Sequence, residues 1–199
     1  MSRPRRWRSP NAGPDEMKPR FCWAPHDALA RRRREDIVGV VLHRIEVSQE
    51  DPTYADTPEG IMRFFLEHPT GVAATGGQMP YPLLIAAEGT VTQCVPLDRV
   101  TPHARSYNPS HLGLALVGDF RRDPPAAAQY EALVQVCAWL LSALDCASTA
   151  LVGHDGLAGG AEDAQKVCPG PYLSLENVRR DVAEVTHPLD WDFVWTRVE

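Results

Sequence analysis

Two histidines and one cysteine stand where they could share a metal ion. His43 follows the apolar run at residues 37–42, His154 follows the short apolar run at 150–152, and Cys168 comes fourteen residues after His154. Strand ends fix side-chain direction, and two imidazoles with one thiolate leave a fourth tetrahedral position open, as in catalytic zinc sites. The ordinary alternative for each histidine is a surface residue or a hydrogen-bonded core imidazole, and spacing alone does not decide between them.

Lys166 is the second unusual residue, because the chain otherwise uses arginine for positive charge. Lys18 and Lys166 are its two lysines, and Lys166 lies two positions before Cys168 in the run Gln-Lys-Val-Cys-Pro-Gly. A lysine carries a compact charge with three rotatable donors, which suits a developing oxyanion. The motif therefore predicts chemistry at this point of the chain, whereas the ordinary alternative is an exposed loop charge.

The composition is that of one globular domain with a basic end. The 199 residues are 44% hydrophobic and 23% charged, which is enough to bury a core. Residues 1–36 hold 10 of the 20 Lys and Arg but only 5 of the 26 Asp and Glu, so the rest of the chain is acidic. The basic end, with its run Arg31–Arg34, could bind an anionic polymer or lipid, or form a solvated arm. The acidic body argues against nucleic acid as a substrate.

Neither a membrane span nor a secretion signal is visible in the sequence. No apolar stretch reaches the roughly 18 residues that cross a bilayer, and no apolar signal-peptide core follows the arginine-rich start. The five cysteines lack the paired spacing of a disulfide scaffold, which suits a reducing compartment. We therefore expect a protein that is cytoplasmic as made and has no membrane span.

Alternating strands and helices are predicted along the chain. Strands are expected at 37–42, 112–117 and 150–152, with a hairpin of 81–85 and 90–95 that turns at Glu88-Gly89. Helices are expected to start at Thr57-Pro58-Glu59, at Asp123-Pro124-Pro125 and at Ser174, the second reaching about Leu144. This order predicts an α/β fold: one domain with a mixed central β-sheet flanked by helices.

We expect three segments. Residues 1–35 are predicted to form a basic N-terminal arm, residues 36–186 the domain that carries the site, and residues 187–199 a C-terminal tail. The tail contains Trp191 and Trp195, and it is too aromatic to be freely solvated, so we expect it to pack on the domain or on a partner.

From about Val41 to Val178 the chain resembles the zinc-dependent N-acetylmuramoyl-L-alanine amidases of the phage-lysozyme and peptidoglycan-recognition-protein type. Six sequence words carry the resemblance in the family's order and approximate spacing. They are Val41–His43, Tyr81–Ile85 with Glu88–Val91, Pro102–Ala104 with Tyr107-Asn108, Leu112–Phe120, Val152–His154 and Lys166–Gly170. The resemblance implies an amidase or peptidoglycan-recognition-like fold.

The resemblance also implies roles by position. His43, His154 and Cys168 match the residues that bind Zn²⁺, and Tyr81 and Lys166 match the catalytic tyrosine and lysine. Zinc polarises an amide carbonyl and activates water, while a phenol and an ammonium group can hold the water and the oxyanion. Without the motif, Tyr81 would be read as a half-buried strand aromatic.

His103 and Asn108 resemble cleft residues of the family, so substrate binding is the role they are assigned. The alternative is that they order their own loop. Asp155 or Asp163 competes for the third ligand position, because related amidases use a carboxylate there, and the Cys-Pro-Gly context favours Cys168. One departure from the family is Pro82, which stands where histidine is usual and predicts an edge strand or a bulge.

The implied function is hydrolysis of the amide bond between N-acetylmuramic acid and L-alanine in peptidoglycan or muropeptides. The alternative is a non-catalytic peptidoglycan-binding module that uses the same cleft. Without a signal peptide, the enzyme would be released through a phage-type pore, exported by a dedicated machine with a delivery or immunity partner, or act on recycled muropeptides.

Overall fold

The computed structural model describes residues 19–157 and 167–196, and a six-stranded sheet forms its centre. The strands are β1 (Arg20–Phe21), β2 (Gly39–Ile45), β3 (Leu83–Ile85), β4 (Val91–Gln93), β5 (His111–Val117) and β6 (Leu151–Gly153). Their order across the sheet is β1-β4-β3-β5-β2-β6. Strands β3 and β4 are antiparallel and all other neighbours are parallel, so the predicted mixed sheet is confirmed.

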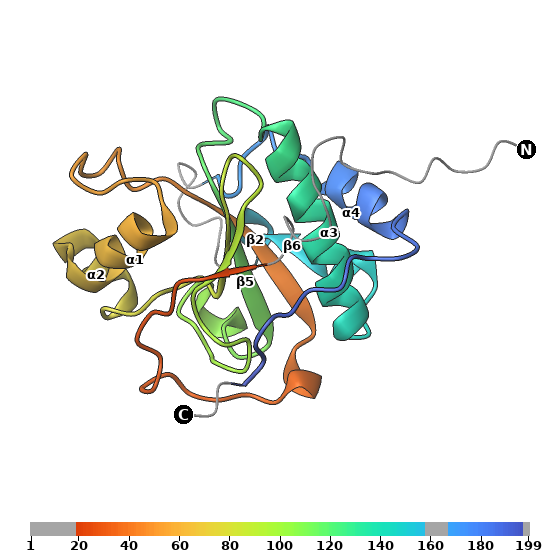
Figure 1. The fold of residues 1–199 in the computed structure, drawn as a ribbon, viewed down its shortest axis with the longest axis horizontal. Coiled ribbons are helices and arrows are strands. Elements are labelled where there is room, and N and C mark those ends of the chain that lie inside the picture. The colour runs from red at the N-terminus through yellow and green to blue at the C-terminus, as the bar shows by residue number, and fades with distance from the viewer. Residues whose placement is uncertain (1–18, 158–166, 197–199) are drawn as a thin grey trace, which may run out of the picture.

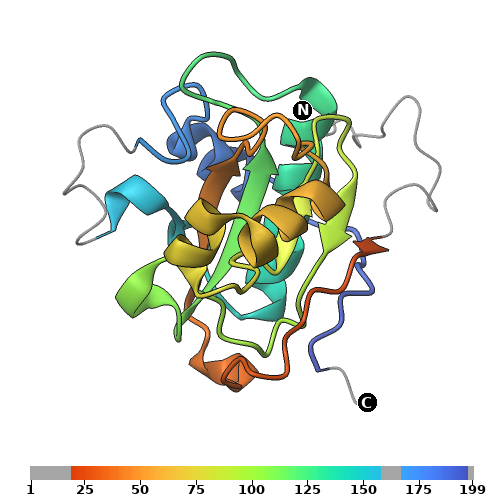
Figure 2. The same cartoon turned by 90° about the vertical axis from the view of Figure 1, so that its left-hand side faces the viewer.

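Helices cover both faces of this sheet. They are α1 (Pro58–Glu67), α2 (Pro69–Thr75), α3 (Ala127–Ala143) and α4 (Leu175–Ala183). Short 3₁₀ helices occupy Arg34–Asp36, Arg105–Tyr107, Ser148–Ala150 and His154–Gly156. Helices α1 and α2 lie on one side and α3 and α4 on the other (Figure 1), and the turned view shows α1 and α2 in front of the sheet (Figure 2).

Two of the predicted helix starts are confirmed and one is wrong. The Thr57 side chain accepts the Gly60 N–H at the start of α1, and the Ser174 side chain accepts the Asn177 N–H at the start of α4. Helix α3 begins only after Ala126, which makes no side-chain cap bond. Asp123 does not cap it, because Pro124 is followed by a second proline, which disfavours a helical conformation at Pro124 and delays the start of the helix.

The sheet separates one large apolar cluster on the α3 and α4 side from two others on its opposite face, and alternation along β2 decides which side each residue faces. Val40 and Leu42 belong to the cluster that includes α3 and α4, and the buried Trp191 and Phe193 of the C-terminal segment join it. Val41 belongs to a smaller cluster on the opposite face. His43, two residues further along β2, therefore points to the side away from α3 and α4.

The predicted hairpin is confirmed, but the expected consequence of Pro82 was wrong. Strand β3 lies inside the sheet between β4 and β5. Pro82 stands just before its first residue, and its carbonyl accepts the Cys94 N–H. The Cys94 carbonyl accepts the Ala24 N–H instead, so the N–H that proline lacks leaves no unpaired acceptor there. The turn is closed by Gly89, whose φ of 87° suits glycine.

The described part of the N-terminal segment lies along the sheet. Strand β1 pairs with β4 at one edge, and Leu29 and Arg32 are buried. Residues 1–18 of the expected basic arm are outside the described residues. None of the described helices is long and apolar enough to cross a bilayer.

Gln129 ties helix α3 to the ends of two strands. Its buried side-chain amide donates hydrogen bonds to the carbonyls of Ile85 (3.0 Å) and Val117 (2.9 Å), the last residues of β3 and β5. A helix that is apolar on most sides thus carries one polar side chain that satisfies two buried acceptors.

Replacing Gln129 with Leu should lower the free energy of unfolding by about 2 kcal/mol, because both carbonyls lose this donor in an apolar setting. Urea titration followed by circular dichroism measures the change. Gln135→Leu, on the same helix at an exposed contact with the Leu189 N–H, is the matched control and should change stability by less than about 0.5 kcal/mol. Equal losses in the two variants would contradict this role for Gln129.

Candidate functional site

The pairing of β2 with β6 brings His43 and His154 together. These strands run parallel with Leu42 opposite Gly153, so the next position on each is a histidine. The two ring centroids are 4.6 Å apart. His43 is 1% exposed and His154 is partly buried, so the pair stands at the margin of the interior.

Backbone groups hold Cys168 against these two strands. The Arg44 N–H donates to Cys168 Sγ (3.5 Å), and the Asp155 N–H donates to the Cys168 carbonyl (2.9 Å). Gly153 leaves room for this approach. A Cβ at position 153 would lie 3.1 Å from Cδ of Pro169, the residue that follows Cys168. The Cys168 Sγ therefore comes to 3.8 Å from His43 Nδ1.

The three side chains fit a metal ion. One ligand atom from each of His43, His154 and Cys168 lies within 4.8 Å of the others. Tetrahedral zinc with these donors needs separations of roughly 3.3–3.7 Å, which small side-chain rotations would reach. Two imidazoles and a thiolate suit zinc chemically. Of the competing carboxylates, Asp155 is not part of this cluster and Asp163 lies outside the described residues.

Burial sets the protonation of the donors. Burial, followed by the neighbouring His103 and His154, holds the pKa of His43 well below its ordinary value, so its imidazole is neutral and can bind a metal. Burial raises the pKa of the Cys168 thiol to about 11, although the Arg44 N–H and the Arg44 charge oppose this. The thiol therefore needs a cation to become a thiolate at neutral pH.

Tyr81 lies beside the cluster, two residues before β3. Its ring centroid is 5.0 Å from that of His43, and the Phe65 ring meets it edge-on at 6.0 Å. Burial, followed by the nearby Cys168, raises the pKa of Tyr81 well above its usual range, so the phenol keeps its proton and can donate it in a hydrogen bond. Lys166, the other predicted catalytic residue, lies outside the described residues.

His103 and Asn108 make contacts within the protein: Asn108 orders its own loop, as the alternative interpretation of the sequence allowed, whereas the contact of His103 with His43 was not predicted. His103 is buried, with Nδ1 3.1 Å from His43 Nε2. Asn108 Oδ1 accepts the backbone N–H groups of His103 (3.0 Å) and Ala104 (2.6 Å). Gly113 was the available sequence signal, because a glycine inside a strand often marks a close approach, and a Cβ there would lie 2.8 Å from His103 Cγ. Contact of His103 and Asn108 with a substrate stays a prediction.

An ion-pair network fastens the end of β2 next to Cys168. Arg44 Nη1 lies 3.3 Å from Asp119 Oδ1, Arg121 reaches both Asp119 oxygens at 2.7 Å, and Arg122 Nε lies 3.3 Å away. The hydrogen bond from Arg121 is the main reason that the pKa of Asp119 falls to about 2. The loop after β5 is thereby tied to the residue whose N–H holds the Cys168 sulfur.

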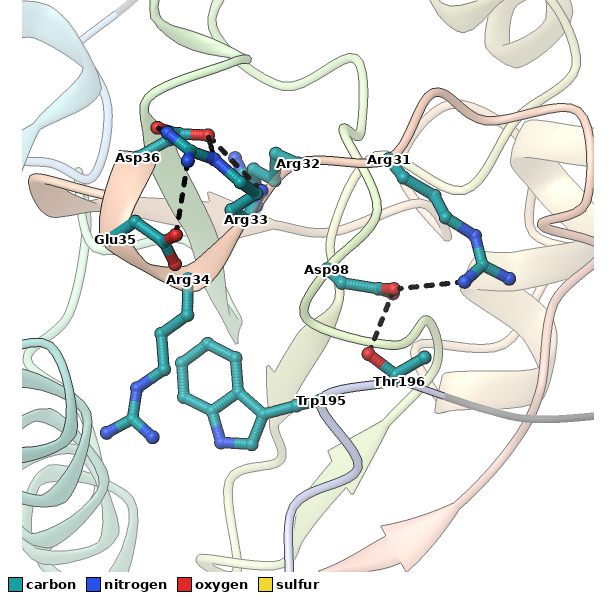
Figure 3. A pocket seen from close by; sticks show the side chains of 9 residues that line it. All are labelled: Arg31, Arg32, Arg33, Arg34, Glu35, Asp36, Asp98, Trp195 and Thr196. Carbon is teal, nitrogen blue, oxygen red and sulfur yellow. Dashed lines mark hydrogen bonds and ion pairs between the residues drawn. The ribbon is translucent and has the colours of Figure 1, made fainter.

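The arginine run lies elsewhere, around a pocket of about 700 Å³ (Figure 3). Arg31 approaches Asp98 at 3.8 Å, and Arg33 pairs with Asp36 at 2.7 Å. The Arg34 guanidinium donates to the Ala143 carbonyl and lies 4.8 Å from the centroid of the Trp195 ring. These three arginines thus have partners within the chain.

Comparison with known proteins gives consistent results. Residues 33–171 match the family model described as N-acetylmuramoyl-L-alanine amidase. The structure is similar to the Ph2119 endolysin of a Thermus scotoductus bacteriophage, with 26% identity over 83% of this chain and 100% of that chain and a TM-score of 0.60.

Two further solved structures share the fold at lower identity. The endolysin amidase LysCS of Clostridium intestinale has 19% identity over 83% of this chain and 96% of that chain, with a TM-score of 0.63. Drosophila PGRP-LB has 17% identity over 79% and 91%, with a TM-score of 0.57. A search of curated protein sequences found no significant match.

The Asp119 network predicts how stability depends on pH. The folded pKa of about 2 lies below the ordinary value of 3.8, so ionised Asp119 stabilises the fold above pH 3.8 and loses this contribution as the pH falls towards 2. Asp119→Asn should therefore be less stable than the wild type at pH 6, on the order of 1 kcal/mol, and the difference should shrink on acidification.

Urea unfolding at a series of pH values between 3 and 7 measures this difference. Asp123→Asn, which removes an exposed carboxylate from the same loop, is the control and should follow the wild-type curve. A deficit of Asp119→Asn that stays constant over the whole range would show that the ionised carboxylate is not responsible.

Proposed function

Because the chain belongs to the N-acetylmuramoyl-L-alanine amidase family, we propose that it hydrolyses the amide bond between N-acetylmuramic acid and L-alanine in peptidoglycan or muropeptides, with zinc as cofactor. The observation that carries the proposal is the convergence of His43, His154 and Cys168 within 4.8 Å. Family membership alone names the class of reaction, and this cluster supports chemistry of that class in this chain.

His43, His154 and Cys168 would hold the zinc ion. Zinc bound by three protein donors polarises a carbonyl oxygen and makes water a competent nucleophile near neutral pH. The protein's own contribution is to present His43 as a neutral imidazole and to stabilise the Cys168 thiolate through the Arg44 N–H. A hydrogen bond from a backbone N–H favours the charged form of an acceptor.

Tyr81 and Lys166 would act on the substrate. A partly buried phenol that stays protonated can donate to the attacking water or to the oxyanion that forms when the amide carbon becomes tetrahedral. Lys166, by its place two residues before Cys168, would supply a compact positive charge to the same oxyanion. Both roles come from the motif, and the proximity of Tyr81 to His43 supports the first.

The alternative is a module that binds muropeptides without cleaving them. The fold is shared with peptidoglycan recognition proteins as well as with endolysins, so the fold does not distinguish the two. Retention of the thiol together with Tyr81 and Lys166 favours the enzyme.

Metal content and activity should be lost together when the thiol is removed. We expect about one zinc ion per purified wild-type chain and a large loss of both zinc and peptidoglycan hydrolysis in Cys168→Ala, because two imidazoles alone bind zinc weakly. Inductively coupled plasma mass spectrometry measures the zinc content of each protein. Cys146→Ala, which removes a thiol from the segment after α3, should keep both.

Mass spectrometry of digested peptidoglycan identifies the bond. Stem peptides with a free L-alanine amino terminus and uncut glycan strands are expected. Release of reducing sugar ends would reject the proposed bond. Binding of muropeptides by the zinc-loaded wild type without any product would establish the binding module instead.

Tyr81→Phe should lower kcat on a soluble muropeptide by at least about 100-fold while leaving the zinc content unchanged, because only the donor to the reacting atoms is lost. Steady-state kinetics and metal analysis of the same preparation test this. Tyr54→Phe removes a phenol from the α1 side of the fold, where its ring packs on Phe64, and should keep the wild-type kcat. An undiminished kcat in Tyr81→Phe would remove Tyr81 from the mechanism.

A further inference from the structure

We propose that His103 is a positioning residue that fixes the tautomer of His43 and thereby directs the lone pair of His43 Nδ1 towards the metal position. The inference rests on the proposed metal site. It concerns how the apoprotein prepares a ligand, which is a property of this chain's own hydrogen bonds.

The argument begins at the carbonyl of His111, the first residue of β5. This oxygen lies 3.2 Å from His103 Nε2. A carbonyl oxygen only accepts hydrogen bonds, so the proton of the neutral His103 ring must be on Nε2. His103 Nδ1 is then an acceptor.

The same reasoning carries the assignment to His43. Its Nε2 lies 3.1 Å from His103 Nδ1, and an acceptor on His103 requires a donor on His43. The proton of His43 is therefore on Nε2, and Nδ1 carries a lone pair. That nitrogen is the one 3.8 Å from Cys168 Sγ, on the side where the three candidate ligands meet.

Several contacts hold the His103 ring in place, together with the His111 carbonyl that accepts its hydrogen bond. Gly113 provides the space that the ring fills. Asn108 Oδ1 accepts the His103 backbone N–H at 3.0 Å. The buried Arg32 donates through Nη1 to the His111 carbonyl (2.7 Å) and to the Asn108 carbonyl (2.6 Å). The acceptor that orients His103 is thus itself held by a guanidinium.

A hydrogen-bond partner behind a metal-binding histidine fixes its tautomer and ring orientation, and loss of such a partner commonly weakens metal binding 10- to 100-fold. His103→Leu removes both hydrogen bonds at similar size, so we expect its zinc dissociation constant to rise by about 10- to 100-fold. His103→Gln should rescue most of the affinity, because its carbonyl oxygen can accept from His43 and its amide can donate to His111.

Competition between each purified protein and a chromophoric zinc chelator measures the constants. His26→Leu is the matched control, since His26 is another buried histidine, bonded through Nδ1 to the Ala24 carbonyl in the N-terminal segment. It should bind zinc like the wild type. Wild-type affinity in His103→Leu, or an equal loss in His103→Gln, would overturn the proposal.

Long-range ¹H–¹⁵N spectra of the zinc-free wild type give a direct readout that needs no variant. The Nε2–H tautomer is expected for both His43 and His103, and an Nδ1–H tautomer at His43 would refute the inference. Neither measurement involves turnover, so a protein that binds zinc with the predicted tautomer but cleaves nothing would defeat the proposed function and leave the role of His103 standing.

Discussion

The parallel pairing of β2 with β6 is the constraint on which the site depends. With Leu42 opposite Gly153, two histidines that are far apart in the chain become neighbours across the ladder. The same two strand ends supply the Arg44 and Asp155 N–H groups that hold Cys168. Because strand side chains alternate between faces, a slip of one residue would turn His43 towards α3 and α4 and separate all three donors.

Burial of this polar cluster explains its electrostatics. An imidazole at 1% exposure cannot carry a charge without loss of solvation, and the partly buried thiol beside it keeps its proton. His43 and Cys168 are therefore uncharged when no cation is present, which lets the apolar sheet tolerate them. A divalent cation reverses the balance for the thiol, whereas the neutral His43 imidazole already has the protonation state of a ligand.

Local sequence signals predicted the parts of the fold that depend on local chemistry. The caps at Thr57 and Ser174, the Gly89 turn and the apolar strands all follow from the residues involved. Helix α2 was not predicted although Pro69 at its start and Gly76 after its end are helix boundary signals, because seven residues are too few to show a helical period. Strand β1 was not predicted because two residues at a sheet edge have no distinctive pattern.

The residues of the candidate site likewise fall into those that the sequence predicted and those that it did not. The motif brought His43, His154, Cys168 and Tyr81 to attention, and the structure places these four near one another. The bond between His43 and His103 could not be predicted, because it depends on how the loop before β5 folds back over Gly113. That geometry is set by contacts between distant segments, which no local spacing encodes.

Arg32 shows why the arginine run is not simply a basic patch. Its neighbours Arg31, Arg33 and Arg34 use acidic residues, a carbonyl or an indole as partners, whereas Arg32 points inward to two carbonyls beside His103. Bridging two fixed acceptors favours a planar guanidinium over a flexible ammonium group, since the donor geometry is preorganised and the charge is less strongly hydrated. Burial lowers the pKa of Arg32 to about 10, yet this group stays protonated at neutral pH, as a buried lysine often would not. A permanent charge can therefore hold the carbonyl that orients His103, and the residue type at position 32 is explained by that requirement rather than by an external anion.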